Sequence, residues 1–385
     1  MSATNSFQTN DESIAEDIAA VRESVRRFID AEIAPHYADW ERAGHMPRDL
    51  WRKMGAAGFL CAAIPEQYGG GGADMRVAFA IVEEFTRSLF ALPGFYTHSE
   101  VIVPYILHYG TEAQKRHWLP RCASGETVTS IAMTEPDAGS DLKGTRTTAR
   151  RDGDEFVVDG QKTFITNGFH ADLVIVLAAT QNDTGKAGKS LLLVEADRPG
   201  FSRGRILDKV GQRAQDTTEL FFEGVRIPAD NLLGESGKGL SYLMMQLPRE
   251  RLAVGVAAIA GAETVLERTL DYTRQRKAFG QPIGEFQHLR FKLAELKTSV
   301  TVARAFLEQC IRKFEAGHLP ADEAAMCKYW LTDVEANVVD QCVQMHGGSG
   351  YMREYPVARA YADVRGQRIY AGTNEIMKEI IARAM

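Results

Sequence analysis

The chain has 385 residues, of which 45% are hydrophobic and 25% are charged, a globular balance that excludes disorder for most of its length. At about 150 residues per domain, this length predicts two or three domains. Acidic residues outnumber basic ones by 51 to 45, and the net charge of −6 argues against a nucleic-acid-binding protein. The longest apolar run, residues 252–262, is shorter than the ~18 residues of a membrane-spanning helix, so it predicts a buried helix.

Cysteine usage and the N-terminal sequence bear on the compartment. The five cysteines are widely spaced without a CxxC pair, which argues against a disulfide framework or a zinc site. The nine histidines show no ligand spacing, so no metal site is predicted. The polar, acidic N-terminus resembles neither a secretory signal nor a transit peptide. We therefore expect a cytoplasmic protein, or a mitochondrial matrix protein if a transit peptide has been removed.

The first stretch of the chain, residues 1–128, is predicted to be a helical domain. Ile14, Ile18, Val21, Val25 and Phe28 recur at steps of four, three, four and three, which is typical of one apolar helical face. Further helices are predicted at 47–57, 76–89, 93–109 and 111–123, separated by Gly and Pro residues.

Residues 129–234 are predicted to form a β-domain. Asp152-Gly153 and Asp159-Gly160 are typical of tight turns between short strands. No helical segment intervenes, so the fold expected here is a small antiparallel barrel or sandwich. The predicted strands are 145–150, 155–159, 162–166, 173–179, 191–195 and 220–222.

Residues 235–385 are predicted to form an antiparallel helical bundle. Long periodic segments cover 237–274, 285–316 and 321–345, and a short terminal helix follows Thr373. The predicted fold class is therefore mainly α with a central β-domain. The sequence lacks a GxGxxG motif between strand and helix, a Walker A loop, an HExxH motif and a GxSxG elbow, so a bound cofactor would need another architecture.

Four segments carry residue types suited to ligand binding, and each also has a purely structural interpretation. The polar loop 133–141 could hold a cofactor edge or be a surface turn, and Phe164 could stack on a flat ring or belong to the core. Segment 276–280 could grip a pyrophosphate or be solvated charge, and the glycine-rich segment 344–350 could approach a ligand or cap a helix.

Taken together and in this order, the segments resemble the acyl-CoA dehydrogenase family of flavoproteins over nearly the whole chain. The third stretch most resembles the long-chain and isovaleryl-type branches. The motifs that carry the resemblance are Ile64-Pro-Glu-Gln-Tyr-Gly-Gly70, Thr134-Glu-Pro with Gly139-Ser-Asp141, Asp159-Gly-Gln-Lys-Thr-Phe-Ile-Thr-Asn-Gly168, Arg276-Lys-Ala-Phe-Gly280, Gln344-Met-His-Gly-Gly348 and Tyr370-Ala-Gly-Thr-Asn-Glu-Ile376.

The resemblance implies bound FAD and an oligomer, commonly a tetramer. The residues that it places against the flavin from the β-domain are Ile131, Met133, Thr134, Gly139, Ser140, Phe164, Ile165 and Thr166. Those that it places on FAD from the helical bundle, in part across a subunit interface, are Arg276, Phe279, Gln287, Gln344, Gly347, Gly348, Thr373 and Glu375.

The chemistry that the resemblance implies is α,β-dehydrogenation of an acyl-CoA thioester in fatty-acid β-oxidation. It requires a carboxylate base and fixed donors to the thioester oxygen. Many family members have Glu in the segment Tyr-Glu-Gly-Thr, where this chain has Ala371. The isovaleryl and long-chain branches instead place Glu before an Arg on the long helix, which matches Glu250 and Arg251. In isolation, Glu250 also fits a solvated residue in a charged run.

The resemblance also implies an acyl-CoA site and an electron acceptor, which is expected to be an electron-transfer flavoprotein. The residues that it assigns to the substrate are Ser140, Tyr242, Arg251, Tyr370, Ala371 and Gly372. His98, Ser99 and the preceding residues 93–96 are expected to line the acyl cavity, unless their segment is the start of a core helix. The alternatives are a flavin oxidase or monooxygenase on the same scaffold, and an acyl-CoA-binding homologue that has lost catalysis.

Overall fold

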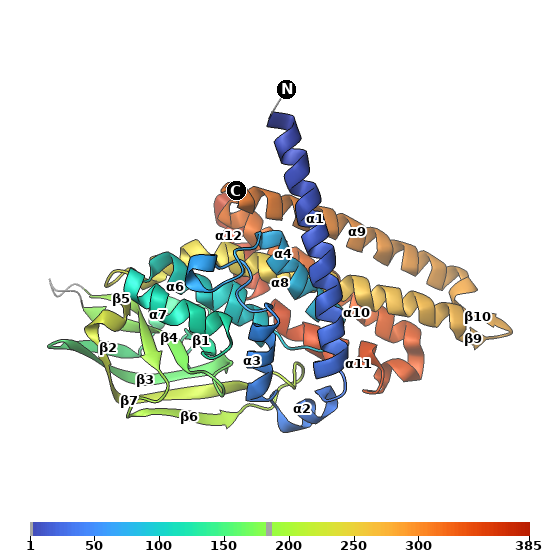
Figure 1. Ribbon diagram of the computed structural model, residues 1–385. Helices are drawn as coiled ribbons and strands as arrows, with labels where there is room; N and C mark the ends of the chain where they lie inside the picture. Colours follow the sequence, from blue (N-terminus) through green and yellow to red (C-terminus); the bar gives the residue numbers. More distant parts are fainter. Residues whose placement is uncertain (1–2, 182–186) are drawn as a thin grey trace. The chain divides into compact units, whose positions relative to one another are not determined.

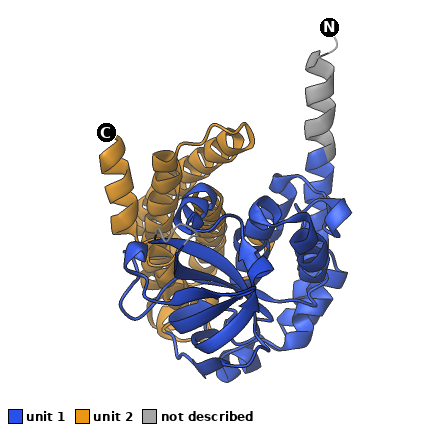
Figure 2. Ribbon diagram, turned by 90° about the vertical axis from the view of Figure 1, so that its left-hand side faces the viewer, with its two compact units in different colours: residues 1–81, 92–209, 213–246 blue, residues 82–91, 210–212, 247–385 orange. Residues whose placement is uncertain are grey.

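A computed structural model describes residues 3–181 and 187–385 (Figure 1). The chain divides into two compact units (Figure 2). Unit 1 contains residues 1–81, 92–209 and 213–246, and unit 2 contains residues 82–91, 210–212 and 247–385. The predicted fold class, mainly helical with a central β-domain, is confirmed. The predicted domain boundaries after residues 128 and 234 stay a prediction.

The helices of unit 1 follow the predicted apolar periodicity. Ile14 and Val25 of α1 are buried, and Ile18, Val21 and Phe28 are half-buried, which confirms the predicted face. Helix α7 begins where Thr111 accepts from the Gln114 N–H and Gln114 accepts from the Thr111 N–H, a capping box. The helices are α1 (Ala3–Phe28), α2 (Tyr37–Ala43), α3 (Arg48–Ala56), the first part of α4 (Met75–Arg87), α5 (Gly94–Tyr96), the π-helical η3 (Thr97–Ile102), α6 (Val103–Tyr109) and α7 (Glu112–Ala123).

One sheet forms the β-region of unit 1. Its order is β6-β7-β3-β2-β4-β5-β8, with β1 paired to β4. Most neighbours are antiparallel, as predicted, but β1 and β2 each pair with β4 in parallel, which the sequence did not indicate. The strands are β1 (Thr129–Ala132), β2 (Thr148–Asp152), β3 (Glu155–Thr166), β4 (Leu173–Gln181), β5 (Ala187–Glu195), β6 (Phe201–Ile206), β7 (Thr217–Pro228) and β8 (Leu232–Leu233).

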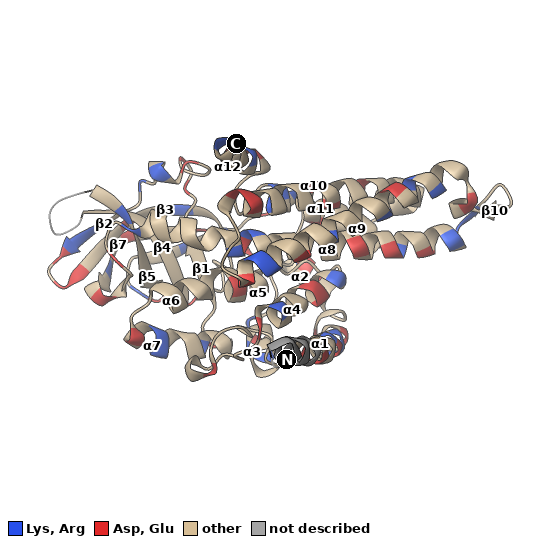
Figure 3. Ribbon diagram, turned by 90° about the horizontal axis from the view of Figure 1, so that it is seen from above, with Lys and Arg blue, Asp and Glu red and all other residues tan. Residues whose placement is uncertain are grey.

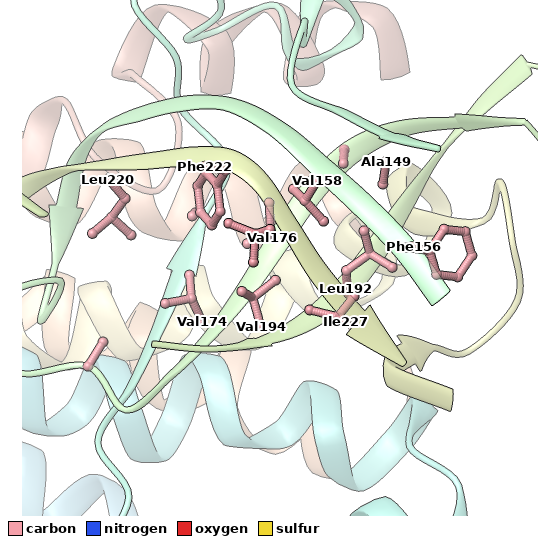
Figure 4. Close-up of a cluster of buried hydrophobic side chains, with 14 of the residues drawn as sticks. Ala149, Phe156, Val158, Val174, Val176, Leu192, Val194, Leu220, Phe222 and Ile227 are labelled. Carbon is pink, nitrogen blue, oxygen red and sulfur yellow. The ribbon is translucent and has the colours of Figure 1, made fainter. Parts of the chain in front are cut away.

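The core of the sheet is an apolar cluster that several strands share (Figure 4). Val174 and Val176 of β4 share this cluster with Leu192 of β5 and Phe222 of β7. Every side chain from residue 173 to 178 is fully buried, so β4 is covered on both faces, which explains its continuous apolar run. Full burial of one such side chain contributes roughly 1.5–3 kcal/mol, so this cluster anchors the strands that carry the predicted flavin residues.

The predicted turn at Asp159-Gly160 is wrong. Strand β3 continues through both residues, and the register against β7 shifts between Val158 and Gly160. Gly160 has a φ of 145°, and a Cβ there would lie 2.5 Å from the Thr147 Oγ1. The glycine therefore marks a bulge at which another part of the backbone comes close. The prediction failed because bulges and tight turns both favour glycine.

Unit 2 contains long helices and a small hairpin. The apolar run 252–262 is a buried part of α8, as predicted. Gly255 lets α10 approach, because a Cβ there would lie 3.1 Å from Cys327 Sγ. Charged residues recur along α9 (Figure 3). The helix buries one apolar stripe, which consists of Leu293, Leu296, Val300, Ala303, Leu307 and Cys310. The elements are α8 (Gly239–Gln275, in unit 2 from Leu247), β9 (Lys277–Ala278), β10 (Gln281–Pro282), α9 (Gln287–Glu315), α10 (Ala321–His346), α11 (Pro356–Val364) and α12 (Asn374–Ala384).

No helix within the two described ranges combines the length and the apolar character that crossing a membrane requires.

Candidate active site

The loop after β1 is held in place by a buried ion pair. Lys162 of β3 is 1% exposed, and its Nζ donates to Glu135 Oε1 at 2.7 Å, to the Met133 carbonyl at 3.1 Å and to the Leu177 carbonyl at 2.7 Å. Burial lowers the pKa of Lys162 to about 8, although Glu135 opposes this shift. The loop that contains Met133 and Thr134 is therefore a fixed structure rather than a free surface turn.

The carboxylate of Glu135 is also satisfied from the backbone. It accepts from the Arg146 N–H at 2.6 Å and from the Thr147 N–H at 3.0 Å. Burial raises the pKa of Glu135, but the bonds from Lys162 and from these backbone groups outweigh it, so the net pKa lies below its usual value. The Thr134 carbonyl accepts from the Thr163 N–H at 2.9 Å, which joins the loop to β3 a second time.

Phe164 is exposed, which excludes the interpretation as a core residue. Its side chain is 68% exposed and its φ is 59°. The register of β3 against β7 shifts between Lys162 and Ile165, so an extra residue is accommodated in a bulge. The bulge turns Phe164 outward while Ile165 stays in the sheet core at 3% exposure. Phe164 thus presents an aromatic face, whereas Ile165 can offer a ligand only its backbone.

The other predicted flavin residues of unit 1 leave space around the backbone. Gly139 and Ser140 are exposed, and a Cβ built on Gly139 would meet no atom within 4 Å. Ile131, Met133, Thr134 and Thr166 are half-buried. These residues belong to the strand ends and the loop that Lys162 anchors.

Two residues that were assigned to substrate or acyl cavity have structural partners. The ring of Tyr242 stacks on Tyr109 with centroids 4.1 Å apart, and its hydroxyl accepts from the Glu235 N–H at 3.0 Å. His98 is fully buried, with Nδ1 accepting from the Thr129 N–H and Nε2 donating to the Cys122 carbonyl. Both ring nitrogens of His98 therefore have a structural role, and the expectation that His98 lines an acyl cavity stays a prediction.

Glu250 and Arg251 are buried in unit 2. Each is 3% exposed, although they stand in a run of charged residues on α8. The solvated interpretation of Glu250 is therefore excluded. Arg251 Nη1 donates to the Ala321 carbonyl at 3.4 Å, and its buried Nε has no hydrogen-bond partner among the described residues. Burial lowers the pKa of Arg251, and the charge of Glu250 opposes this shift.

The segment 370–374 adopts a strained conformation in the same unit. Ala371 and Gly372 have φ values of 54° and 85°, both in the left-handed region. Among the described residues, the Ala371 N–H has no acceptor. Thr373 then caps α12 by accepting from the Ile376 N–H at 3.3 Å. The exposed Glu375 follows in the first turn of α12, and Tyr370 is half-buried.

The segment 276–280 forms a hairpin with an exposed aromatic tip. Strands β9 and β10 are joined by Phe279 and Gly280, with φ values of 51° and 84°, as a two-residue turn of this kind requires. Phe279 is 97% exposed, and Arg276 and Gln287 are exposed as well. Exposure of this tip is compatible with the predicted contact to another subunit.

The end of α10 combines a buried histidine with open glycines. His346 stacks on Tyr272 with centroids 4.1 Å apart, and its Nδ1 contacts the Cys342 carbonyl at 2.8 Å, so it has a structural role. Gln344, Gly347 and Gly348 are exposed, and a Cβ on either glycine would meet no atom within 4 Å. The glycine segment thus caps the helix and also leaves room for a ligand.

Three successive parts of the chain match the domains of one known protein family. Residues 15–126, 130–225 and 237–385 match the profiles of the N-terminal, middle and C-terminal domains of acyl-CoA dehydrogenases. The long-chain specific acyl-CoA dehydrogenase of Sus scrofa, a mitochondrial protein, is 50% identical over 94% of this chain and 85% of its own length. The chain belongs to the acyl-CoA dehydrogenase family.

Solved structures of the family superpose closely on this chain. The acyl-CoA dehydrogenase from Geobacillus kaustophilus is 49% identical with a TM-score of 0.92, covering 96% of this chain and 98% of that one. A glutaryl-CoA dehydrogenase from Mycobacterium smegmatis, solved in complex with FADH2, is 30% identical with a TM-score of 0.88, covering 96% and 94%. This acyl-CoA dehydrogenase family member is thus an oxidoreductase of a flavoprotein family that acts in acyl-CoA dehydrogenation.

Sequence reasoning missed the side chains that hold the predicted site residues in place. Lys162, Glu135 and Asn374 lay inside the quoted motifs without an assigned role, and Lys328 was not singled out. A signal for Lys328 exists in the helical spacing. It lies on the buried stripe of α10 at steps of four and three, with the members Ala324, Lys328, Leu331, Glu335, Val338 and Cys342.

Proposed function

We propose that this acyl-CoA dehydrogenase family member converts an acyl-CoA thioester to the trans-2-enoyl-CoA, with Glu250 as the base and FAD as the cofactor. The observation that carries the proposal is the burial of Glu250. A carboxylate at 3% exposure within the run Arg249-Glu250-Arg251 is unusual, because charged residues are rarely buried without a role or a partner.

Glu250 removes the proton from the carbon next to the thioester carbonyl in this proposal. Exclusion of water strengthens a carboxylate as a base, since fewer solvent hydrogen bonds must be broken as it takes the proton. Arg251 stabilises the charged form, because its buried guanidinium interacts electrostatically with Glu250. The orphaned Nε of Arg251 is a remaining donor for a substrate group.

Ala371 supplies a fixed donor for the thioester oxygen. A backbone N–H persists when Glu is replaced by Ala at this position, so the loss of the carboxylate does not remove the donor. The positive φ of Ala371 is strained for a residue with a Cβ, and such strain concentrates at functional sites. Its N–H lacks an acceptor within the described part of the chain, as expected for a group reserved for substrate.

The predicted FAD residues fit a flat aromatic cofactor with an anionic linker. Phe164 offers an exposed ring, Gly139, Gly347 and Gly348 leave open space at the backbone, and Arg276 is an exposed cation. When bound, FAD supplies the acceptor for the hydride that leaves the adjacent carbon. The remaining residues proposed to hold it are Ile131, Met133, Thr134, Ser140, Ile165, Thr166, Phe279, Gln287, Gln344, Thr373 and Glu375.

The proposal also covers the acyl-chain length of the substrate, the electron acceptor and the oligomeric state. The 50% identity to a long-chain specific enzyme supports a long-chain acyl-CoA as the substrate. An electron-transfer flavoprotein is the proposed acceptor, and a homotetramer the proposed assembly. Ser140, Tyr242, Tyr370 and Gly372 are the further proposed substrate contacts. A panel of acyl-CoA thioesters of different lengths, scored by flavin bleaching under anaerobic conditions, measures the length preference directly.

The decisive experiment replaces the base with its neutral isostere. Glu250→Gln is expected to retain FAD but to lose roughly 10²–10⁴-fold in the rate of bleaching by acyl-CoA, the range that a positioned base contributes. Glu267→Gln, at an exposed position of the same helix, is the matched control and should bleach at the wild-type rate. A Glu250→Gln variant with wild-type bleaching would reject the assignment.

Flavin absorbance also distinguishes the proposed dehydrogenase from the two alternative functions. A wild-type protein whose reduced flavin reacts rapidly with oxygen would favour the oxidase or monooxygenase. A wild-type protein that binds acyl-CoA without any bleaching would favour the non-catalytic homologue, and the burial of Glu250 is the observation against that outcome.

A further inference from the structure

A lysine is buried directly behind the segment that carries Ala371. Lys328 of α10 is fully buried, and its Nζ donates to the Gly372 carbonyl at 2.7 Å and to Asn374 Oδ1 at 2.9 Å. Within the described ranges, no carboxylate lies within 4.0 Å of this ammonium group. Burial, and then the positive charge of Arg251, lowers the pKa of Lys328 to about 8.

A lysine at this position is costly if it serves only to fill space. Removing an ammonium group from water without a counter-ion costs several kcal/mol, and an apolar side chain of similar size would pack on this stripe at less cost. Its neighbours on the stripe, Ala324 and Leu331, are apolar and fully buried. The presence of a lysine here therefore indicates a role that requires a hydrogen-bond donor, which Leu or Met cannot supply.

The hydrogen-bond partners of the ammonium group indicate the role of Lys328. Ala371 and Gly372 are consecutive residues with positive φ, and a left-handed Ala costs roughly 1–2 kcal/mol unless the surroundings enforce it. Lys328 binds the carbonyl of the second of these residues. The same side chain also binds Asn374, whose Nδ2 donates to the Tyr329 carbonyl, to Thr332 Oγ1 and to Asp333 Oδ1 at 3.1–3.3 Å. The segment is thus tied to α10 immediately after Ala371.

We propose that Lys328 is a positioning residue, which holds the Ala371–Gly372 backbone so that the Ala371 N–H stays directed at the thioester oxygen. This inference rests on the proposed function, in which that N–H is the donor. Lys328 itself binds neither substrate nor flavin in this account. It acts through the Gly372 carbonyl, and Asn374 fixes the ammonium group in place.

The test measures the strength of the hydrogen bond to the thioester carbonyl. Lys328→Met keeps the length of the side chain but removes the donor, and Lys378→Met is the matched control, because Lys378 is exposed and packs over Tyr329 in the same region. The probe is a long-chain acyl-CoA with ¹³C at the thioester carbonyl, bound to the FAD-loaded enzyme in the Glu250→Gln background to prevent turnover. Isotope-edited infrared difference spectra report the carbonyl stretch.

The expected result is a split between variants. The stretch should be shifted to lower frequency in the parent and in Lys378→Met, and should return toward its value in solution in Lys328→Met. With Glu250 intact, Lys328→Met should lose about 10–100-fold in kcat with a small change in KM, which is below the 10²–10³-fold cost of deleting a donor outright. A role in packing alone would leave the carbonyl stretch unchanged.

Each outcome decides between the two proposals. A shifted stretch in both the parent and Lys328→Met would overturn the role of Lys328 while keeping the Ala371 donor. An unshifted stretch in the parent itself would instead overturn the Ala371 donor within the proposed function. If Lys328→Met does not retain FAD, the variant Lys328→Met/Asn374→Leu removes both buried polar partners together, and the same two outcomes apply to it.

Discussion

The two units each bury a lysine completely, and the two lysines differ in their partners. Lys162 of unit 1 and Lys328 of unit 2 both have a pKa lowered to about 8, first of all by burial. Lys162 has a carboxylate partner, Glu135, at 2.7 Å. Within the described residues, Lys328 donates only to the Gly372 carbonyl and the Asn374 amide oxygen. The charge of Arg251 lowers its pKa further, whereas the more weakly interacting Asp333 and Glu375 oppose this shift.

The different partners indicate which part of the structure each lysine stabilises. The charges of Lys162 and Glu135 compensate each other, and the carboxylate also accepts two backbone N–H groups, so the pair fixes the loop 133–135 through contacts within unit 1. A lysine with only neutral acceptors depends on those acceptors being held in place, so Lys328 couples α10 to the 370–374 segment. The first arrangement supports the proposed flavin side, and the second supports the proposed thioester donor.

The largest expected effect follows from breaking the ion pair. Lys162→Met leaves the Glu135 carboxylate buried without its cation, which should lower the free energy of unfolding by roughly 3–5 kcal/mol and reduce FAD content. Chemical denaturation at neutral pH measures the first quantity, and flavin absorbance the second. Lys143→Met, at an exposed position, is the control, and should change stability by less than about 0.5 kcal/mol. A Lys162→Met variant as stable as its control would contradict the comparison.

A second expected effect concerns His98, the buried histidine of unit 1. Its folded pKa is lowered to about 4, chiefly by burial, from 6.5 in the unfolded chain. Because the unfolded chain binds this proton more tightly, neutral His98 contributes fully to the free energy of unfolding above pH 6.5. This contribution is lost as the pH falls toward 4. The loss amounts to about 3 kcal/mol.

The measurement for His98 is the pH dependence of the unfolding free energy between pH 4 and 7. His98→Gln should flatten this dependence, although it lowers stability at pH 7 by breaking the bonds to Thr129 and Cys122. His318→Gln, at an exposed position, should keep the wild-type slope. Parallel slopes in His98→Gln and wild type would show that His98 does not titrate as its burial requires.

The smallest expected effect concerns Glu335 of unit 2, where stability is lost as the pH rises and not as it falls. Glu335 lies seven residues after Lys328 on the same stripe of α10, about 10 Å away, too far to pair with it. Burial raises its pKa well above the ordinary value, and its Oε2 has no partner among the described residues. With the folded pKa raised, stability is complete below the unfolded pKa and falls as pH rises above about 4.5.

Glu335→Gln should therefore be more stable than wild type at pH 8 by about 1 kcal/mol, with the advantage shrinking toward pH 5. Unfolding free energies at the two pH values provide the measurement. Glu308→Gln on the exposed side of α9 serves as the control and should show no such trend. A Glu335→Gln variant that is destabilised at both pH values would show that the carboxyl group has an essential partner.

Local patterns predicted the elements whose residues repeat with one period. The stripe from Ile14 to Phe28, the buried run 252–262 and the continuous apolar strand 173–179 all appear as expected, because burial of one face imposes its period on the sequence. Asp159-Gly160 misled the prediction, because bulges and turns both select glycine for positive φ. The parallel pairing of β1 with β4 has no local signature, since the partners are more than 40 residues apart.

Six motifs in a specific order were sufficient to predict the family from the sequence. The absence of a carboxylate at Ala371 also pointed to Glu250 as the base. The folded structure was needed to show that Glu250 is buried, that Phe164 points outward from a bulge and that Lys328 binds the backbone beside Ala371. Residue type and spacing are local properties of the chain. Burial and hydrogen-bond partners depend on segments that meet only when the chain has folded.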